Sequence, residues 1–221
     1  MIHLQNVKKV FSHPSEGTTV PILDIPIFQI DDGQHIGLRG ESGSGKTTLL
    51  HIISGMSTAD SGSILISGTD LATLSESERD RFRANHIGYI FQSFNLLDGF
   101  TALENVMLGM LFADKGSRKD EAVSLLEKVG LSNRLHFKPS QLSVGQQQRV
   151  CIARAIANNP EILLADEPTG SLDSKTSQEI MDLLFDVSEG RILLVVSHDE
   201  EVLSQFHQTL DLQILNKAAL V

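Results

Sequence analysis

Three short and continuously apolar segments of the chain predict buried β-strands. They cover residues 35–39, 162–165 and 192–196, and each stops at a polar or glycine-rich turn. Strands of this kind are typical of parallel sheets that helices cover on both faces, and such sheets bind ligands beyond the carboxyl ends of their strands. The pattern therefore predicts an α/β core with its chemistry at one edge of the sheet.

The first 30 residues show a different pattern, in which polar and apolar positions alternate. Pro14, Gly17, Pro21 and Pro26 lie among them. Short alternating runs separated by such residues favour a small antiparallel sheet over a helix-linked unit. We therefore expect an antiparallel β region before the α/β core.

Helical spacing of apolar residues begins near residue 94 and continues to residue 158. Ser117 is a candidate N-cap and Gly130 a candidate C-cap of one helix there. A further helix is expected from Gln146 to Asn158, and Pro160 stops it. The predicted single domain has an antiparallel β region at 1–30, an α/β core at 31–93 and 159–221, and a helical subdomain at 94–158.

Charge and cysteine content narrow the classes of function. The 221 residues carry a formal net charge of -10, which argues against a protein that covers a nucleic-acid backbone with basic surface. We therefore expect no nucleic acid as a partner. Cys151 is the only cysteine, so neither a disulfide framework nor a thiolate metal cluster is expected, and we interpret it as a small buried apolar residue.

The apolar runs are also too short to cross a bilayer. The longest, such as residues 192–196, fall far below a membrane span, and the amino terminus lacks the features of a signal peptide. We expect a cytoplasmic chain. If it works at a membrane, another polypeptide must supply the membrane-spanning part.

Residues 40–47 read GESGSGKT and match the phosphate-loop pattern G-x-x-x-x-G-K-[ST], between a predicted strand and the apolar run 49–53. A flexible glycine-rich turn is the alternative, but the flanking elements favour a phosphate site. Backbone N–H groups and a helix N-terminus attract phosphate oxygens, Lys46 adds a point charge, and Thr47 offers a hydroxyl to Mg²⁺. The predicted binding residues for a nucleoside triphosphate are Gly40, Ser42, Gly43, Ser44, Gly45, Lys46, Thr47 and Thr48.

Two adjacent carboxylates, Asp166 and Glu167, end the second predicted strand. Charge at the end of an apolar strand needs a reason, and a metal supplies one for Asp166. Glu167 would then orient or deprotonate the water that attacks the γ-phosphate. Two solvated loop acids are the alternative.

Two further polar residues follow apolar strands. His198 comes after the third predicted strand, so a parallel sheet would bring it to the same edge as Gly40 and Asp166. A single histidine is more often a structural hydrogen-bonding residue, so the case for a role at the γ-phosphate rests on the position of His198 alone. Gln92 follows the run 89–91, and its amide suits contacts to Mg²⁺ and water.

Residues 142–149, LSVGQQQR, resemble the LSGGQ signature of ABC-transporter ATPases. The phosphate loop, Gln92, Asp166-Glu167, the segment 171–173 and His198 follow in that family's order, so the resemblance covers essentially the whole chain. It implies a RecA-like P-loop NTPase core with an inserted helical subdomain. It also implies ATP and Mg²⁺ as cofactors, with Thr47, Gln92 and Asp166 at the metal.

The signature adds a second anion site at the start of a helix, formed by Ser143, Gly145 and Gln146. One γ-phosphate does not need two such sites within one subunit. The family resembled here pairs two subunits head to tail, so that each ATP lies between one phosphate loop and the partner's signature. The resemblance therefore implies a homodimer that closes on ATP and opens after hydrolysis.

Three single positions leave alternatives open. Asp173 matches a family loop that crosses the dimer interface, but it equally suits an N-cap for a helix near Lys175. Phe11 matches the aromatic that stacks on adenine, although an aromatic after a strand is more often core. Val144 stands where the family usually has glycine, which weakens the trans site if left-handed backbone is needed there and is silent otherwise.

Segments 91–97, 101–106 and 164–173 resemble the lipoprotein-releasing, macrolide-exporting and cell-division branch of the family. This implies integral membrane permease subunits as partners and a peripheral location on the inner face of the cell membrane. The apolar stretch 94–100 would form part of the groove for the membrane partner, with plain subdomain core as the alternative. Two hypotheses follow: an enzyme that energises export or extraction, or a regulatory ATPase that signals to cell-wall enzymes without transport.

Overall fold

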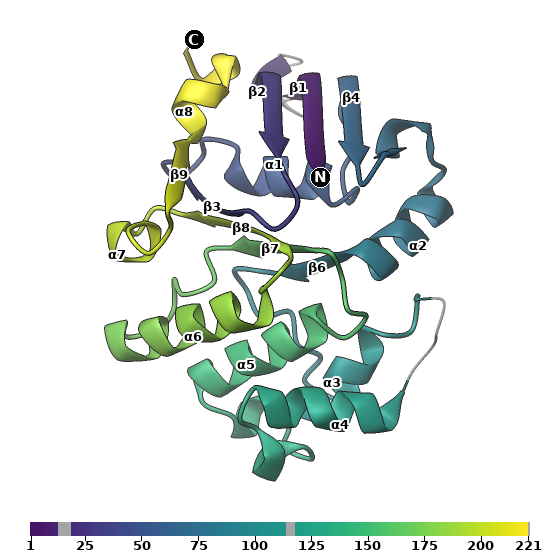
Figure 1. The fold of residues 1–221 in the computed structure, drawn as a ribbon, viewed down its shortest axis with the longest axis vertical. Coiled ribbons are helices and arrows are strands. Elements are labelled where there is room, and N and C mark those ends of the chain that lie inside the picture. Colours follow the sequence, from purple (N-terminus) through teal and green to yellow (C-terminus); the bar gives the residue numbers. More distant parts are fainter. Residues whose placement is uncertain (13–18, 114–117, 221) are drawn as a thin grey trace.

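The computed structural model describes residues 1–12, 19–113 and 118–220. Within these ranges a five-stranded parallel sheet crosses the middle of the molecule (Figure 1). Its strand order is β6-β7-β8-β3-β9. The strands are β3 (His35–Arg39), β6 (Ile87–Ile90), β7 (Ile162–Asp166), β8 (Ile192–Ser197) and β9 (Gln208–Asp211).

The three strands predicted from apolar runs are neighbours in this sheet. Asp166 pairs with Val196, and Arg39 pairs with Ser197, so β3, β7 and β8 end at the same level. The residues that follow these strands therefore meet at one edge, as the sequence predicted. All five residues of β7 are buried because helices cover both faces of the sheet.

A separate four-stranded antiparallel sheet lies on one side of this core, in the order β2-β1-β4-β5. Its strands are β1 (Ile2–Ser12), β2 (Thr19–Ile30), β4 (Ser61–Ile66) and β5 (Thr69–Asp70). The antiparallel region therefore does not end at residue 30, and the prediction that placed 61–70 in the α/β core is wrong. Gly62 weakens the sequence pattern of strand β4. Glycine is needed there because φ is +95° and a Cβ would lie 2.5 Å from the Asn6 carbonyl oxygen. Pro14 and Gly17 lie outside the described residues.

Helix α1 (Lys46–Ile53) lies between the two sheets (Figure 1). Its buried residues Leu49, Leu50, Ile52 and Ile53 join a hydrophobic core with side chains from both sheets. The other helices on this side and beside the sheet are short or peripheral: α2 (Glu76–His86), α7 (Glu200–Leu203) and α8 (Leu212–Leu215). The core therefore fixes the start of α1 against the edge of the parallel sheet.

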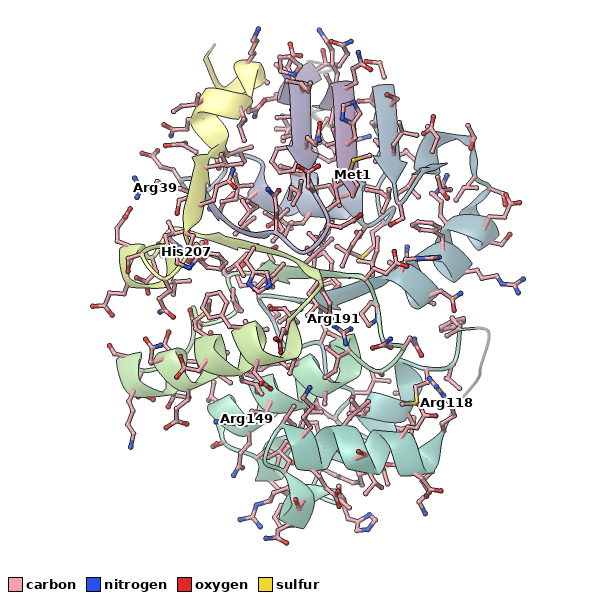
Figure 2. The ribbon with its side chains drawn as sticks, viewed as in Figure 1. Met1, Arg39, Arg118, Arg149, Arg191 and His207 are labelled. Atoms are coloured by element: carbon pink, nitrogen blue, oxygen red, sulfur yellow. The ribbon has the colours of Figure 1, made fainter. Side chains whose placement is uncertain are left out.

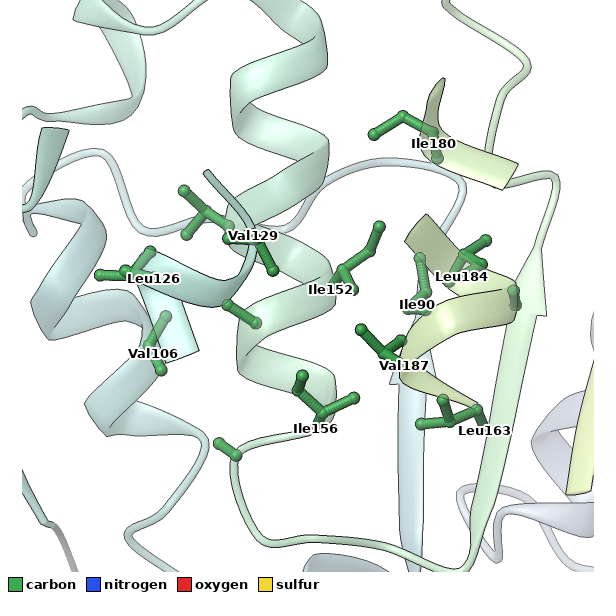
Figure 3. Close-up of a cluster of buried hydrophobic side chains, with 14 of the residues drawn as sticks. Ile90, Val106, Leu126, Val129, Ile152, Ile156, Leu163, Ile180, Leu184 and Val187 are labelled. Atoms are coloured by element: carbon green, nitrogen blue, oxygen red, sulfur yellow. The ribbon is translucent and has the colours of Figure 1, made fainter. Parts of the chain in front are cut away.

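The opposite face of the sheet is covered by a helical layer: α3 (Ala102–Leu108), α4 (Lys119–Lys128), α5 (Val144–Ala155) and α6 (Ser174–Val187). Figure 3 shows Val106, Leu126 and Ile152 from three of these helices in one cluster with Ile90 and Leu163 of the sheet. The helical insertion thus shares its core with the sheet. Arg149, which Figure 2 labels, connects the layer further, since it donates to the Val129 carbonyl oxygen at 3.1 Å and to Glu179 of α6 at 3.1 Å.

The helix boundaries differ from the prediction in places. The helix expected from Gln146 to Asn158 is α5, which begins at Val144 because Ser143 caps it and ends at Ala155. Gly130 follows α4 at φ +78°, as expected for a helix stop, whereas the predicted N-cap Ser117 lies outside the described residues. Short 3₁₀ turns cover Leu71–Thr73, Ser132–Arg134, Pro139–Gln141 and Lys217–Leu220. Among the described residues, none of the helices has the length and apolar character that a membrane span requires.

Candidate active site

The turn between β3 and α1 requires glycine at two points. Gly45 is the N-cap of α1 with φ +96°, and a Cβ there would lie 3.0 Å from Leu23 Cδ2 and 3.1 Å from the Ile22 carbonyl oxygen. A Cβ at Gly40 would lie 2.6 Å from Ser44 Oγ. The turn is therefore packed closely against Leu23 and Ile22 of β2 and against the Ser44 side chain, and the first turn of α1 that follows it has free backbone N–H groups.

Lys46 begins α1 and is 8% exposed. Its ammonium donates to the carbonyl oxygens of Gly40 at 2.6 Å and Glu41 at 3.0 Å. The same nitrogen lies 3.5 Å from Oε1 of Glu167. This arrangement holds a positive charge at the mouth of the loop, with one carboxylate as its partner.

Glu167 is 7% exposed and makes contacts through both carboxylate oxygens. Oε2 accepts a hydrogen bond from Ser197 Oγ at 3.0 Å, and Oε1 lies 2.8 Å from Nδ1 of His198. Its backbone has φ +45°, a left-handed conformation that costs a non-glycine residue energy and that clusters at functional sites. The chain around β7 and β8 therefore fixes both the position and the direction of this side chain.

Asp166 precedes Glu167 but has different surroundings. It is 4% exposed, and burial raises the pKa of its carboxyl, while a hydrogen bond with the Thr47 side chain acts in the opposite direction. Its Oδ1 atom is buried without a hydrogen-bond partner. A buried carboxylate beside a hydroxyl fits a hard divalent cation, which takes oxygen ligands and offsets the cost of desolvation. Among the described residues no group of three or more His, Cys, Asp or Glu side chains forms a metal cluster.

Lys46, Thr47, Asp166 and Glu167 line one cavity of about 540 Å³. It includes Gln92 and His198, which the sequence placed at the same edge, and Phe11, which is 49% exposed and therefore not a core residue. Ser44 and Gly40 belong to the loop but do not line the cavity, and Ile22 and Glu41 are additions to the predicted set. The lining residues are Phe11, Ile22, Glu41, Ser42, Gly43, Gly45, Lys46, Thr47, Thr48, Gln92, Asp166, Glu167 and His198.

The signature residues line a different cavity of about 670 Å³. Ser143 caps α5 by accepting from the Gln146 N–H, and Gly145 packs so tightly that a Cβ would lie 2.7 Å from Thr176 Cγ2. Asp173, on the same cavity, is the N-cap of α6, as the sequence suggested. The structure therefore does not bring this second group to the phosphate loop of the same chain.

Val144 is the first residue of α5 and is 42% exposed. It is absent from the described residues with positive φ, so the backbone there does not need glycine. Of the two interpretations that the sequence left open, the structure favours the silent one.

Sequence reasoning missed two contacts of the site. Ser197 ends β8 and donates to Glu167, although the sequence placed only its neighbour His198 at the site. Tyr89 of β6 is buried, which raises the pKa of its hydroxyl, and the Asp166 charge raises that pKa further. A polar residue at the end of a buried strand was an available signal for Ser197; Tyr89 gave none, since it has the pattern of an ordinary strand aromatic.

The glycine-rich phosphate loop, the adjacent carboxylates Asp166 and Glu167 and the parallel sheet define a P-loop nucleoside triphosphatase. The family model described as "ABC transporter" matches residues 23–170. The chain belongs to the ABC transporter family, as its signature segment predicted, and it is an ATP-binding and ATP-hydrolysing component.

Named relatives cover most of the chain. It is 42% identical to the ABC transporter ATP-binding protein YtrE of Bacillus subtilis, over 96% of this chain and 94% of that protein. It is 41% identical to the lipoprotein-releasing system ATP-binding protein LolD of Treponema denticola, over 92% of this chain and 91% of that protein. The macrolide export ATP-binding/permease protein MacB of Bdellovibrio bacteriovorus is 42% identical over 91% of this chain, which spans only 31% of that protein.

A solved structure confirms the fold class. The dimeric post-hydrolysis state of the ATP-binding cassette MJ0796, bound to ADP and Pi, superposes with a TM-score of 0.88. The two chains are 38% identical over 99% of this chain and 95% of the other. The predicted RecA-like core with an antiparallel sheet and a helical insertion is therefore the fold of this chain.

Proposed function

We propose that two copies of this chain pair head to tail around two Mg-ATP and drive a separate membrane permease of the export or lipoprotein-release type. The main support is that one chain has two separate phosphate-binding surfaces, which we call half-sites: the cavity around the phosphate loop and the cavity around Ser143. The relatives named LolD and MacB support the type of permease, and the dimeric cassette supports the pairing.

The phosphate-loop cavity would carry the chemistry. Phosphate oxygens would compete with Glu167 for the Lys46 ammonium, whose nitrogen lies 3.5 Å from Oε1 of Glu167. Glu167, oriented by Ser197, would then orient or deprotonate the attacking water. His198, whose Nδ1 lies 2.8 Å from Glu167, would contact the γ-phosphate, and Phe11 would stack on the adenine.

Mg²⁺ would be held by Thr47, Asp166 and Gln92, and it would neutralise charge on the phosphates when bound. Thr47 and Asp166 already interact, and Gln92 lines the same cavity. Asp166 would keep its charged form there, since a cation offsets the burial that raises its pKa.

The second cavity would complete the partner's site. The start of α5 presents the first-turn backbone N–H of Gly145 together with the Ser143 side chain, which suits the far side of a γ-phosphate. Asp173 would lie at the interface while it caps α6. Each ATP would then close the gap between two chains.

The membrane partner would dock on a groove of about 400 Å³ between the sheet and the helical layer. Its apolar lining includes Phe91 and Phe112, the latter 73% exposed, and Arg83 and Arg154 lie at its polar side. The predicted stretch 94–100 does not line this groove. Such docking would place the chain in the cytoplasm against the inner face of the membrane.

Mixing two inactive variants tests the composite site. In a dimer of Lys46→Ala with Ser143→Ala, one site carries both changes and the other carries neither. Random mixing makes half of the dimers mixed, so we expect about one quarter of the wild-type ATPase rate, measured as phosphate release, if the two sites turn over independently. Each variant alone should remain below a few per cent.

A matched control separates this from nonspecific rescue. Lys46→Ala mixed with Glu167→Gln should show no recovery, because both residues lie in the same phosphate-loop cavity and every site in the mixed dimer is then damaged. Recovery in this control, or none in the first mixture, would contradict head-to-tail pairing.

A further inference from the structure

Two buried polar atoms near the metal-facing edge of the sheet have no hydrogen-bond partner: the Tyr89 hydroxyl and Oδ1 of Asp166. Tyr89 is 8% exposed and Asp166 is 4% exposed. One is a donor and the other is an acceptor. Leaving either atom unsatisfied in the interior costs free energy, so native proteins rarely do so without a reason.

The strand register puts both side chains on one face of the parallel sheet. Tyr89 of β6 pairs with Leu164 of β7, and Asp166 is two residues further along β7. Because side chains alternate along a strand, Leu164 and Asp166 point to the same side as Tyr89. A tyrosine side chain spans the diagonal between such positions.

Helix α1 covers this face with a matching pair of residues. His51 places its ring 5.8 Å from the Tyr89 ring, and Thr47, one helical turn earlier, interacts with Asp166. The contact between His51 and Tyr89 therefore lies beside the contact between Thr47 and Asp166. The Tyr89 ring packs against His51 and, with 4.3 Å between ring centroids, against Phe91, and its hydroxyl is close enough to Asp166 to feel that charge.

The two oxygens of Asp166 are not equivalent. Oδ1 is buried without a hydrogen-bond partner, whereas Oδ2 is not among the buried unpaired atoms of the described residues, and Asp166 lines the phosphate-loop cavity beside Thr47. A carboxylate that is tethered at its inner oxygen keeps its outer oxygen in one direction, whereas an untethered carboxylate rotates. If Asp166 binds a metal through Oδ2, a hydrogen-bond donor to its inner oxygen, Oδ1, would therefore hold the carboxylate in the required direction.

We propose that the Tyr89 hydroxyl donates a hydrogen bond to Oδ1 of Asp166, directly or through one water, and thereby orients Oδ2 toward Mg²⁺. Tyr89 is a positioning residue, since it acts through Asp166. This inference rests on the proposed magnesium site. His51 is the competing donor, because its ring lies against Tyr89 and its charge also acts on Asp166.

The test is Tyr89→Phe, which removes only the hydroxyl. Binding of ADP is measured by titration calorimetry with Mg²⁺ and with EDTA, so that no hydrolysis or ATP-driven pairing intervenes. We expect the gain in ADP affinity from Mg²⁺ to fall roughly three- to tenfold, while affinity in EDTA is unchanged. In ATPase assays the Mg²⁺ concentration for half-maximal rate should rise by a similar factor, with kcat at saturating Mg²⁺ within about twofold.

The outcomes separate the inference from the function on which it rests. If the wild-type chain gains no ADP affinity from Mg²⁺, the magnesium site itself fails. A wild-type gain that Tyr89→Phe retains in full would overturn the role of the hydroxyl alone.

Two further variants distinguish the Tyr89 hydroxyl from the Tyr89 ring and from His51. Tyr89→Leu also removes the ring, so we expect the same loss of Mg²⁺ dependence as in Tyr89→Phe, together with a lower Tm. A loss seen only in Tyr89→Leu would assign the effect to ring packing. Loss in His51→Asn but not in Tyr89→Phe would assign the inner hydrogen bond to His51. Either result overturns the proposal.

Discussion

Asp166 and Glu167 are neighbours in sequence, yet the fold gives their carboxylates different partners. Glu167 has Ser197, His198 and Lys46 around it, so its charge is stabilised by hydrogen bonds and a cation. Asp166 is buried, and the proposed donor to its Oδ1, the Tyr89 hydroxyl, is a neutral group and not a cation. The free protein therefore carries Asp166 at a cost in stability, which a bound cation would remove.

Removing the Asp166 charge should stabilise the nucleotide-free protein. Burial raises the pKa of this carboxyl above its usual 3.8, so the folded state binds more protons than the unfolded state as pH rises from that value, and stability falls. Asp166→Asn should therefore show a higher Tm than wild type at pH 7 to 8, with a difference that shrinks toward about pH 4. Scanning calorimetry without nucleotide measures this.

Asp98→Asn is the matched control, because Asp98 is an exposed loop carboxylate. It should leave the Tm close to that of wild type across the same pH range. An Asp166→Asn protein no more stable than wild type at neutral pH would mean that the buried charge is compensated within the free chain.

The sheet positions the site because β6 and α5 approach each other closely. Gly88 on β6 makes this possible: a Cβ there would lie 2.6 Å from Leu163 Cδ2 and closer still to the Ala155 carbonyl oxygen. α5 in turn carries the Ser143 cap at its other end. This packing contact between a strand and a helix is thus one of the links between the sheet edge and the helix that carries Ser143.

Gly88→Ala should destabilise the chain by about 1–3 kcal/mol, because the added methyl group meets backbone and forces the strand and helix apart. Urea unfolding followed by circular dichroism measures the change. Gly99→Ala is the control: nothing lies within 4 Å of a Cβ there, so its free energy of unfolding should change by less than about 0.5 kcal/mol. Equal effects of the two changes would show that the close approach does not limit stability.

Elements with a strong periodic signal were predictable and weakly patterned ones were not. The central strands β3, β7 and β8 each contain a short apolar run that ends at a polar residue, and these runs were visible in the sequence. Helix α2 buries no residue fully and β5 has two residues, so neither leaves a periodic trace. Helix α2 begins at a capping box formed by Ser75 and Glu78, and β5 forms by pairing with the end of β4.

The candidate site divides in the same way. Motif residues such as Lys46 and Asp166 were predictable because spacing and flanking strands identify them. Side-chain partnerships were not, since the Ser197–Glu167 hydrogen bond joins residues 30 apart and depends on the register of β7 and β8. The left-handed backbone of Glu167 likewise leaves no mark in the sequence.

At the scale of the whole molecule, nucleotide state should control assembly. Glu167→Gln keeps the shape of the side chain and loses the base, so ATP binding should persist while turnover falls by about 100-fold or more. The variant should elute as a dimer in Mg-ATP, by size exclusion with light scattering, and as a monomer without nucleotide. Glu161→Gln, an exposed change on another surface, should behave as wild type. A Glu167→Gln protein that turns over ATP normally would refute the assigned base.

The trapped dimer also tests the docking groove. Tagged Glu167→Gln protein purified in Mg-ATP from gently solubilised membranes should retain an integral membrane permease, identified by mass spectrometry. Adding Phe112→Asp, which places a charge on the exposed apolar wall, should release the permease but leave the dimer intact. Retention of the permease by the double variant would move the docking surface elsewhere.

The two cavities of one chain also set the size of the assembly. They are chemically different halves, and in the proposed pairing a two-fold axis would join the first half of each copy to the second half of the other. Two copies would then use up all four halves and leave no open end for a third. A chain with unlike surfaces, which by simple translation would build a filament, would in this pairing stop growing at two and carry two nucleotides.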